Sequence, residues 1–237
     1  MISTKAISKS FGKLQVLKNI NLEFSQGSVV ALIGPNGSGK TTLIKCLLGL
    51  VIPDQGEIYF KGMNILGTWE YRKYIGYMPQ INRFPEQMEV GRVFKMMRDL
   101  RMDGAGTDEE LIHLFGLHTS MNKRMNALSG GTRQKVSAAL AYLFQPEMLF
   151  LDEPTSGLDP VAAEHFKNKI IQGKQQGKIT LITSHNMSEV EELADRVIFI
   201  SDGSIGFDKN VSAILSETGV PRLNKALAKL MEGVGHA

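Results

Sequence analysis

Apolar residues in this chain gather in short continuous runs, which are separated by stretches with the three-to-four-residue period of helices. Three such runs are Ser28–Ile33, Met148–Leu151 and Ile179–Thr183. Continuous apolar runs of this length are typical of strands that are buried on both faces. Strands that alternate with helices predict a mostly parallel sheet covered by helices on both sides.

The first 60 residues depart from this alternation. Short strand patterns at Ile2–Ile7 and Ile20–Phe24 flank a turn at Gly12-Lys13, and Glu57–Lys61 resumes a strand. These patterns suggest a small antiparallel sheet beside the main one.

Residues from about 85 to 141 also depart from it, because helical patterns dominate there. One of these helices is expected at Asp108–Phe115, where Thr107 and Glu110 resemble a capping box. After the last strand, a short helical tail is expected from about 211 to 237. We therefore expect one α/β domain over residues 1–237, with a small antiparallel β subdomain, this helical insert and this tail.

Composition and charge exclude some classes of protein. The 237 residues carry 27 Lys and Arg against 24 Asp and Glu, a net charge of +3 that argues against a nucleic-acid-binding surface. The stretch Lys61–Arg101 holds eight basic and four acidic residues, which indicates either a solvated face or a surface near a membrane or a partner subunit. With Cys46 as the one cysteine, no intramolecular disulfide forms and a reducing compartment is expected. No apolar stretch is long enough to span a bilayer.

A glycine-rich loop follows the strand Ser28–Ile33 directly and opens a helix. It matches the pattern G-x-x-x-x-G-K-[ST], whose backbone N–H groups curl round a phosphate chain. Lys40 can reach the β- and γ-phosphates, and the Thr41 hydroxyl can ligate Mg²⁺. The nucleotide-binding positions expected here are Gly34, Pro35, Asn36, Gly37, Ser38, Gly39, Lys40, Thr41 and Thr42.

Two further clusters carry chemistry that suits a nucleotide. Asp152 and Glu153 end an apolar strand, where the first can hold Mg²⁺ and the second can polarise an attacking water. Ser129, Gly130 and Gly131 begin a helix and form a second anion site. One chain cannot easily bring both anion sites to one nucleotide, whereas two chains facing head to tail can.

These motifs, in this order, resemble those of the ATP-binding subunit of ABC transporters. The resemblance covers residues 2–215. It implies a P-loop NTPase core, ATP and Mg²⁺ as cofactors, and ATP hydrolysis as the activity.

The resemblance also implies roles for single residues. Gln80 matches the glutamine that touches Mg²⁺ and water and couples to the permease, and His185 matches the histidine that senses the γ-phosphate. Asp159 is the last residue of Ser156–Asp159, which matches the segment that crosses the dimer interface. Phe11 stands where an aromatic ring stacks on adenine, although tyrosine is more frequent there and core packing is the alternative.

The signature segment Leu128–Thr132 matches the family except at Thr132, where glutamine is usual. Phosphate contacts by Ser129 and Gly131 are still expected, but any contact made by that glutamine side chain is lost. Contacts of this kind with a partner's ATP imply a head-to-tail homodimer that sandwiches two nucleotides.

The resemblance further implies partners and a location. The expected partner is a polytopic membrane permease, which would rest in a groove beside Gln80 and Ile81–Arg101 and hold the protein on the cytoplasmic face of the cell membrane. Leu128–Val136 and the tail at 220–231 resemble the subunit that serves copper-site maturation of nitrous-oxide reductase. That resemblance implies export and a periplasmic accessory protein.

Two other classes of protein share part of this pattern. A soluble ABC-type ATPase in cofactor or Fe–S cluster assembly would carry the same motifs without a transport role. A nucleotide kinase would share the phosphate loop, but it would not explain Ser129-Gly130-Gly131, Asp152-Glu153 and His185 together.

Overall fold

The computed structural model describes residues 1–101 and 106–234, with side chains up to residue 231. Parts of the expected helical insert, at 102–105, and of the expected tail, at 235–237, lie outside the described residues.

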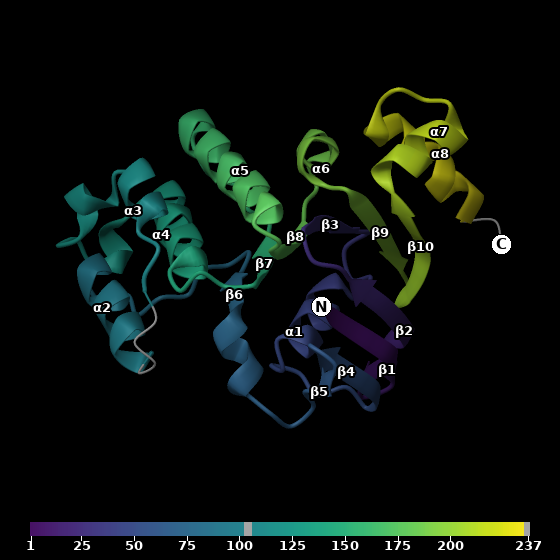
Figure 1. Cartoon of the computed structure of the whole chain (residues 1–237), viewed down its shortest axis with the longest axis horizontal. Helices are drawn as coiled ribbons and strands as arrows, with labels where there is room; N and C mark the ends of the chain where they lie inside the picture. The colour runs from purple at the N-terminus through teal and green to yellow at the C-terminus, as the bar shows by residue number, and fades with distance from the viewer. Residues whose placement is uncertain (102–105, 235–237) are drawn as a thin grey trace.

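The larger sheet contains six strands in the order β10-β9-β3-β8-β7-β6. All neighbours in it are parallel except β9 and β10, so the mostly parallel sheet predicted from the apolar runs is confirmed (Figure 1). Its strands are β3 Ser28–Ile33, β6 Ile75–Met78, β7 Met148–Asp152, β8 Ile179–Thr183, β9 Arg196–Ser201 and β10 Ser204–Asn210.

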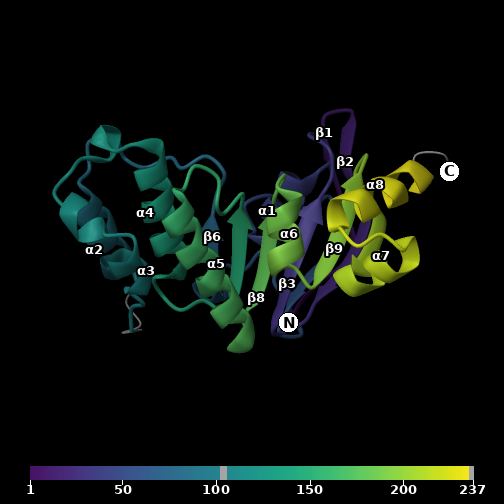
Figure 2. The same cartoon turned by 90° about the horizontal axis from the view of Figure 1, so that it is seen from above.

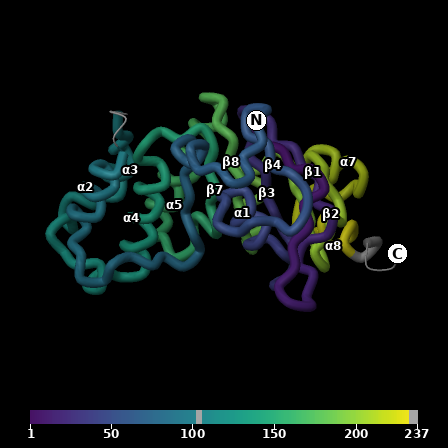
Figure 3. The backbone as a smooth tube through the Cα atoms, turned by 90° about the horizontal axis from the view of Figure 1, so that it is seen from below, coloured from purple at the N-terminus to yellow at the C-terminus, as the bar shows by residue number. Residues whose placement is uncertain are grey.

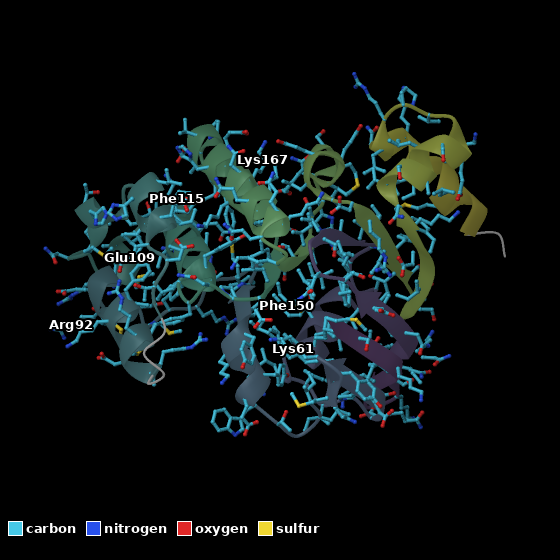
Figure 4. All side chains as sticks on the ribbon, in the orientation of Figure 1. Lys61, Arg92, Glu109, Phe115, Phe150 and Lys167 are labelled. Atoms are coloured by element: carbon cyan, nitrogen blue, oxygen red, sulfur yellow. The ribbon has the colours of Figure 1, made fainter. Side chains whose placement is uncertain are left out.

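Each central strand of this sheet serves two hydrophobic cores. Successive side chains of a strand point to opposite faces. Leu149 and Leu151 of β7 therefore join the core under the helices, whereas Met148 and Phe150 join the core that the small sheet shares. Figure 4 labels Phe150 near the centre of the molecule. This double burial explains why the central strands are apolar at every position rather than at every second one.

The second sheet is antiparallel, in the order β2-β1-β4-β5. Its strands are β1 Ile2–Phe11, β2 Leu14–Phe24, β4 Gln55–Phe60 and β5 Met63–Asn64. β1 and β2 extend to the turn itself, several residues beyond the predicted Ile2–Ile7 and Ile20–Phe24. In β1 the polar, partly exposed residues Ser8–Ser10 still pair backbone to backbone with β2, so the hydrophobic pattern of β1 ends before the ladder does.

Helix α1, Lys40–Leu47, fills the space between the two sheets (Figure 1). The opposite face of the larger sheet is covered by helices, among them α5 and α6 (Figure 2). The helices on that side include α4 Gly130–Tyr142, α5 Pro160–Gln175 and α6 Met187–Leu193.

The helical region between β6 and β7 also contains α2 Val90–Leu100, α3 Glu110–Leu114 and the short 3-10 helices Leu117–Ser120 and Met125–Ala127. Phe115 packs edge-on against Phe166 of α5 at 6.3 Å between ring centroids, which ties this region to the core. The expected capping box is wrong. Asp108 Oδ1 accepts from the Glu110 N–H at 3.0 Å, and the Thr107 hydroxyl contacts Glu109 instead.

The chain ends in α7 Val211–Thr218 and α8 Leu223–Val234, separated at Gly219, which has a positive φ of 66°. Leu223 and Leu227 are buried in the core beneath α6 and α7. Figures 1 and 3 place this tail at the opposite end of the molecule from α2 and α3. Within the described part of the chain, no helix combines the length and the apolarity that a membrane crossing requires.

Candidate nucleotide-binding site

The phosphate loop joins β3 to α1 in a conformation that excludes larger side chains at two glycines. Gly34 has φ 149° and Gly39 has φ 108°. A Cβ atom would lie 2.0 Å from the Ile200 carbonyl oxygen at the first position and 2.7 Å from the Val16 carbonyl oxygen at the second. The loop therefore needs glycine for space as well as for backbone angle.

Lys40, the first residue of α1, turns back over this loop. Its Nζ donates to the carbonyl oxygens of Gly34 at 2.7 Å and Pro35 at 2.8 Å. Burial lowers the pKa of Lys40, while the charges of Asp152 and Glu153 act in the opposite direction. The amine thus lies between the loop and the acidic pair, where it can contact a bound phosphate chain.

A cavity of about 340 Å³ collects most of the expected site residues. It is bordered by the phosphate loop and by the carboxyl ends of β6, β7 and β8, where ligands bind in open α/β sheets. The expected residues that line it are Asn36, Gly37, Gly39, Lys40, Thr41, Thr42, Gln80, Asp152, Glu153 and His185.

The Glu153 carboxylate, just after β7, lies close to side chains that follow β6 and β8. The Gln80 side chain donates from Nε2 to Glu153 Oε1 at 3.1 Å, and His185 Nε2 lies 3.5 Å from the same oxygen. The Glu153 backbone has φ 51°, a left-handed value that is uncommon outside glycine. A water held beside this carboxylate would meet a base whose position several side chains fix.

Thr183 belongs to this site, although the sequence reasoning did not single it out. Because β7 and β8 pair in register, Thr183 lies opposite Asp152, and its hydroxyl donates to Asp152 Oδ1. Its backbone oxygen also accepts from the Glu153 N–H at 3.0 Å. A polar residue at the end of the apolar run Ile179–Thr183 was the available signal.

The oxygen ligands at one end of the cavity suit Mg²⁺. The Thr41 hydroxyl, the Gln80 amide oxygen and the Asp152 carboxylate are hard donors of the kind this ion prefers. No cluster of three or more His, Cys, Asp or Glu residues fit for a metal occurs among residues 1–101 and 106–234. The three oxygen donors Thr41, Gln80 and Asp152 fit an ion that completes its coordination with water and substrate phosphates.

Eight of the expected nucleotide-binding residues lie outside the cavity lining: Phe11, Gly34, Pro35, Ser38, Ser129, Gly130, Gly131 and Asp159. Phe11, at the end of β1, is 52% exposed, which excludes the core-packing alternative for this ring. Lys9 Nζ lies 5.5 Å from the ring centroid.

The signature turn and the segment before α5 are in contact with each other. A Cβ on Gly131 would lie 2.6 Å from the Gly157 carbonyl oxygen. Ser129 caps α4 by accepting from the Thr132 N–H at 3.2 Å, and Asp159 caps α5 by accepting from the Ala162 N–H at 3.0 Å.

Comparison with known proteins identifies the family. The family model described as "ABC transporter" matches residues 17–156. The arginine transport ATP-binding protein ArtM of Bacillus subtilis (strain 168) is 33% identical over 98% of this chain and 100% of its own length. The lantibiotic transport ATP-binding protein SrtF of Streptococcus pyogenes is 34% identical over 88% of this chain and 90% of its own.

Solved structures agree with this result. One described as the structure of the ATP binding subunit of an ABC transporter superposes with a TM-score of 0.88 at 25% identity, covering 98% of this chain and 99% of that one. A second, described as a dimeric ABC transporter cassette, shares the fold with a TM-score of 0.79 at 24% identity over 89% of this chain and 98% of its own. The predicted fold, ATPase activity and cofactors are thereby confirmed, and the chain belongs to the ABC transporter family as an ATP-binding subunit that hydrolyses ATP.

Proposed function

We propose that this subunit is the motor of a membrane transporter, and that its ATP site is completed by a second copy of the chain. The observation that carries the proposal is the division of the motifs. Lys40, Asp152 and Glu153 line one cavity, whereas the signature turn begins another helix and does not line it. A partner's Ser129–Gly131 would then close the nucleotide between two subunits.

The cavity residues that belong to the nucleotide-binding motifs have proposed tasks in hydrolysis. Lys40 and the loop amides hold the β- and γ-phosphates, and Thr41, Gln80 and Asp152 hold Mg²⁺, which neutralises charge on the phosphates when it is bound. Glu153 accepts the proton of the attacking water. Its carboxylate is oriented by Gln80 and lies near His185, which we assign to the γ-phosphate.

A groove of about 500 Å³ beside this site suits the proposed permease. Its walls include Phe84, Met97, Leu100 and Phe144, so a helix or loop of the partner could bury apolar side chains there. Pro79 and Asn82 line the groove, whereas Gln80 between them lines the nucleotide cavity. The segment 79–82 therefore connects the two cavities, and a permease seated there would hold the subunit on the cytoplasmic face of the membrane.

We further infer the cargo class from the resemblance of Leu128–Val136 and residues 220–231. That resemblance favours export linked to copper-site assembly of nitrous-oxide reductase, with a periplasmic accessory protein as a further partner. The relatives found by comparison are named for other cargoes, including arginine and lantibiotics. Deleting the gene should leave nitrous-oxide reductase in the periplasm without its copper centre, and a fully metallated enzyme would exclude this cargo.

The central experiment uses Glu153→Gln, which keeps the size of the side chain and removes the base. This variant should lose ATP turnover and accumulate as a dimer with ATP, detected by size-exclusion chromatography. Lys40→Ala should fail to bind ATP and stay monomeric. Rapid hydrolysis by Glu153→Gln would exclude Glu153 as the base, and unchanged ATP affinity in Lys40→Ala would exclude the loop assignment.

Capture of the tagged full-length chain from detergent-solubilised membranes tests the transport role. A polytopic membrane protein should co-purify, and Phe84→Asp, which puts a charge into the groove, should release it while ATP binding persists. Recovery of the chain entirely in the soluble fraction, bound to a cluster-assembly protein, would instead support the soluble ATPase.

A further inference from the structure

Gln134, on the second turn of α4, is hydrogen-bonded both to the Glu153 backbone and to Asn82, a residue that lines the groove proposed for the permease. Its side chain is buried, with 7% of the residue exposed. Nε2 of Gln134 donates to the Glu153 carbonyl oxygen at 3.3 Å, and Oε1 accepts from Asn82 Nδ2 at 2.6 Å. One amide thus links α4, the loop after β6 and the end of β7.

The chemistry of the end group fixes the direction of both hydrogen bonds. A backbone carbonyl oxygen can only accept, so Gln134 must present its NH₂ group to Glu153. Its amide oxygen then faces Asn82, which must present its own NH₂ group in turn. The two hydrogen bonds therefore fix which end of each amide group, NH₂ or oxygen, faces its neighbour in Gln134 and in Asn82.

Asn82, at the end of this row of hydrogen bonds that is farther from Glu153, lies at the groove. It lines the groove of about 500 Å³ and an adjoining cavity of about 590 Å³ beside Arg133. Its Oδ1 is buried and has no hydrogen-bond partner within the described structure. A buried unsatisfied oxygen is costly, so a rearrangement of this loop on permease binding that brings a donor to Oδ1 would be favourable.

At the other end, Gln134 acts on the peptide of Glu153 and not on its carboxylate. The Glu153 carbonyl oxygen also accepts from the Ser156 N–H at 3.2 Å. Such external contacts are needed because the left-handed backbone of Glu153, with φ 51°, is unfavourable for a residue with a side chain. Gln80 contacts the carboxylate separately, at 3.1 Å.

We propose that Asn82 and Gln134 are positioning residues, which hold the Glu153 peptide for hydrolysis and link it to the groove by a route independent of Gln80. The proposal rests on the proposed function, in which Glu153 is the base and the groove holds the permease. A partner that donates to Asn82 Oδ1 would polarise both amides and strengthen the hold on the Glu153 carbonyl.

The test uses the purified full-length chain and steady-state ATPase kinetics. Gln134→Met keeps the length of the side chain and removes both hydrogen bonds. Its kcat should fall roughly tenfold, because small displacements of a catalytic group are costly, whereas KM for ATP should stay within about twofold. Gln172→Met, on the exposed side of α5, is the matched control and should retain full kcat.

Asn82→Ala keeps the proposal testable if Gln134→Met folds poorly, because Asn82 lies nearer the surface. Its kcat should fall by a smaller factor, and the double variant should be no slower than Gln134→Met alone, since both act through one chain of hydrogen bonds. With Glu153→Gln added, Gln134→Met should still form the ATP-bound dimer.

Three results would overturn the inference: unchanged kcat in both variants, multiplicative losses in the double variant, or a loss of ATP binding that tracks a lower melting temperature. Failure of the proposed function gives a different result, since Glu153→Gln itself would then hydrolyse ATP. An inactive Glu153→Gln beside a fully active Gln134→Met removes the positioning role alone.

Discussion

Nζ of Lys135 lies 2.5 Å from Oδ2 of Asp159, which joins the first turns of α4 to the start of α5. The hydrogen bond from Lys135, followed by that from the Ala162 N–H, holds the pKa of Asp159 below its ordinary value of 3.8. Folding therefore favours the ionised carboxylate at a point where two proposed interface segments meet.

Lys135→Met should remove part of this stabilisation in a pH-dependent way. Because the folded pKa is depressed, the contribution is fully present above the ordinary pKa and is lost as pH falls through the lower folded value. Denaturant unfolding should show the variant with a lower free energy of unfolding than wild type near neutral pH, and this difference should narrow as pH falls below the ordinary pKa of 3.8. Lys135→Arg should retain most of the wild-type stability. A difference between Lys135→Met and wild type that does not depend on pH would contradict the assignment to this ion pair.

The sequence predicts the parts of the fold that depend on local pattern. The run Ser28–Ile33 gives β3 with both ends correct, because a strand buried on two faces is apolar throughout and a glycine loop ends it. The outer half of β1 is missed because Ser8–Ser10 are polar and partly exposed, and pairing with β2 defines the strand there.

The candidate site likewise contains residues that a local motif reveals and residues that only the folded structure brings together. The phosphate loop and the pair Asp152-Glu153 are visible as contiguous motifs. Thr183 and Gln134 are not, since they reach Glu153 across 30 and 19 residues of sequence. Their contacts depend on the register of β7 with β8 and on where α4 crosses the end of β7, and neither can be read from a single segment.

Phe11→Ala should weaken ATP binding, because the exposed ring offers a flat surface for the base. Removing an aromatic platform costs about 1–3 kcal/mol per stacked base, which corresponds to roughly 5- to 150-fold in Kd. Calorimetric titration with ATP measures the loss. Phe11→Tyr should bind normally.

Inorganic triphosphate supplies the control for Phe11, since it lacks a base. Its affinity should be the same for wild type and Phe11→Ala. Equal weakening of ATP and triphosphate would show that Phe11 acts on the loop and does not contact adenine.

Cys46 should resist thiol reagents in the folded protein. It lies in α1 with 1% of its surface exposed, and burial raises the pKa of its thiol to about 11. Because the folded pKa is raised, the neutral thiol contributes stability below its ordinary value of 9.0, and this contribution is lost as pH rises through about 11. Labelling with a disulfide reagent near pH 8 should be slow natively and fast in denaturant.

An exposed thiol introduced into the same chain provides a reference for the labelling rate of Cys46. Ser212 is exposed on α7, so Ser212→Cys combined with Cys46→Ala should react quickly in the folded protein. If native Cys46 reacted as fast as this control, α1 would open readily behind the phosphate loop.

The departure of this chain from the family signature, at Thr132, has its own expected effect. The Thr132 hydroxyl lies 2.9 Å from Ser129 Oγ, which also accepts from the Thr132 N–H. If Thr132 donates both of these hydrogen bonds, the Ser129 hydroxyl must point its own hydrogen outwards, as a donor towards an incoming phosphate.

Thr132→Val keeps the shape and removes that second donor, so ATP-driven dimer formation should weaken by roughly fivefold, the value of one ordinary hydrogen bond. The dimer fraction of the Glu153→Gln variant, titrated with ATP, provides the measurement. Thr132→Ser should restore it, because the hydroxyl returns. The melting temperature should barely change, since the Thr132 N–H still caps α4 through Ser129. Undiminished dimerisation of Thr132→Val would mean that Ser129 is oriented by the nucleotide itself and that Thr132 only replaces the glutamine in space.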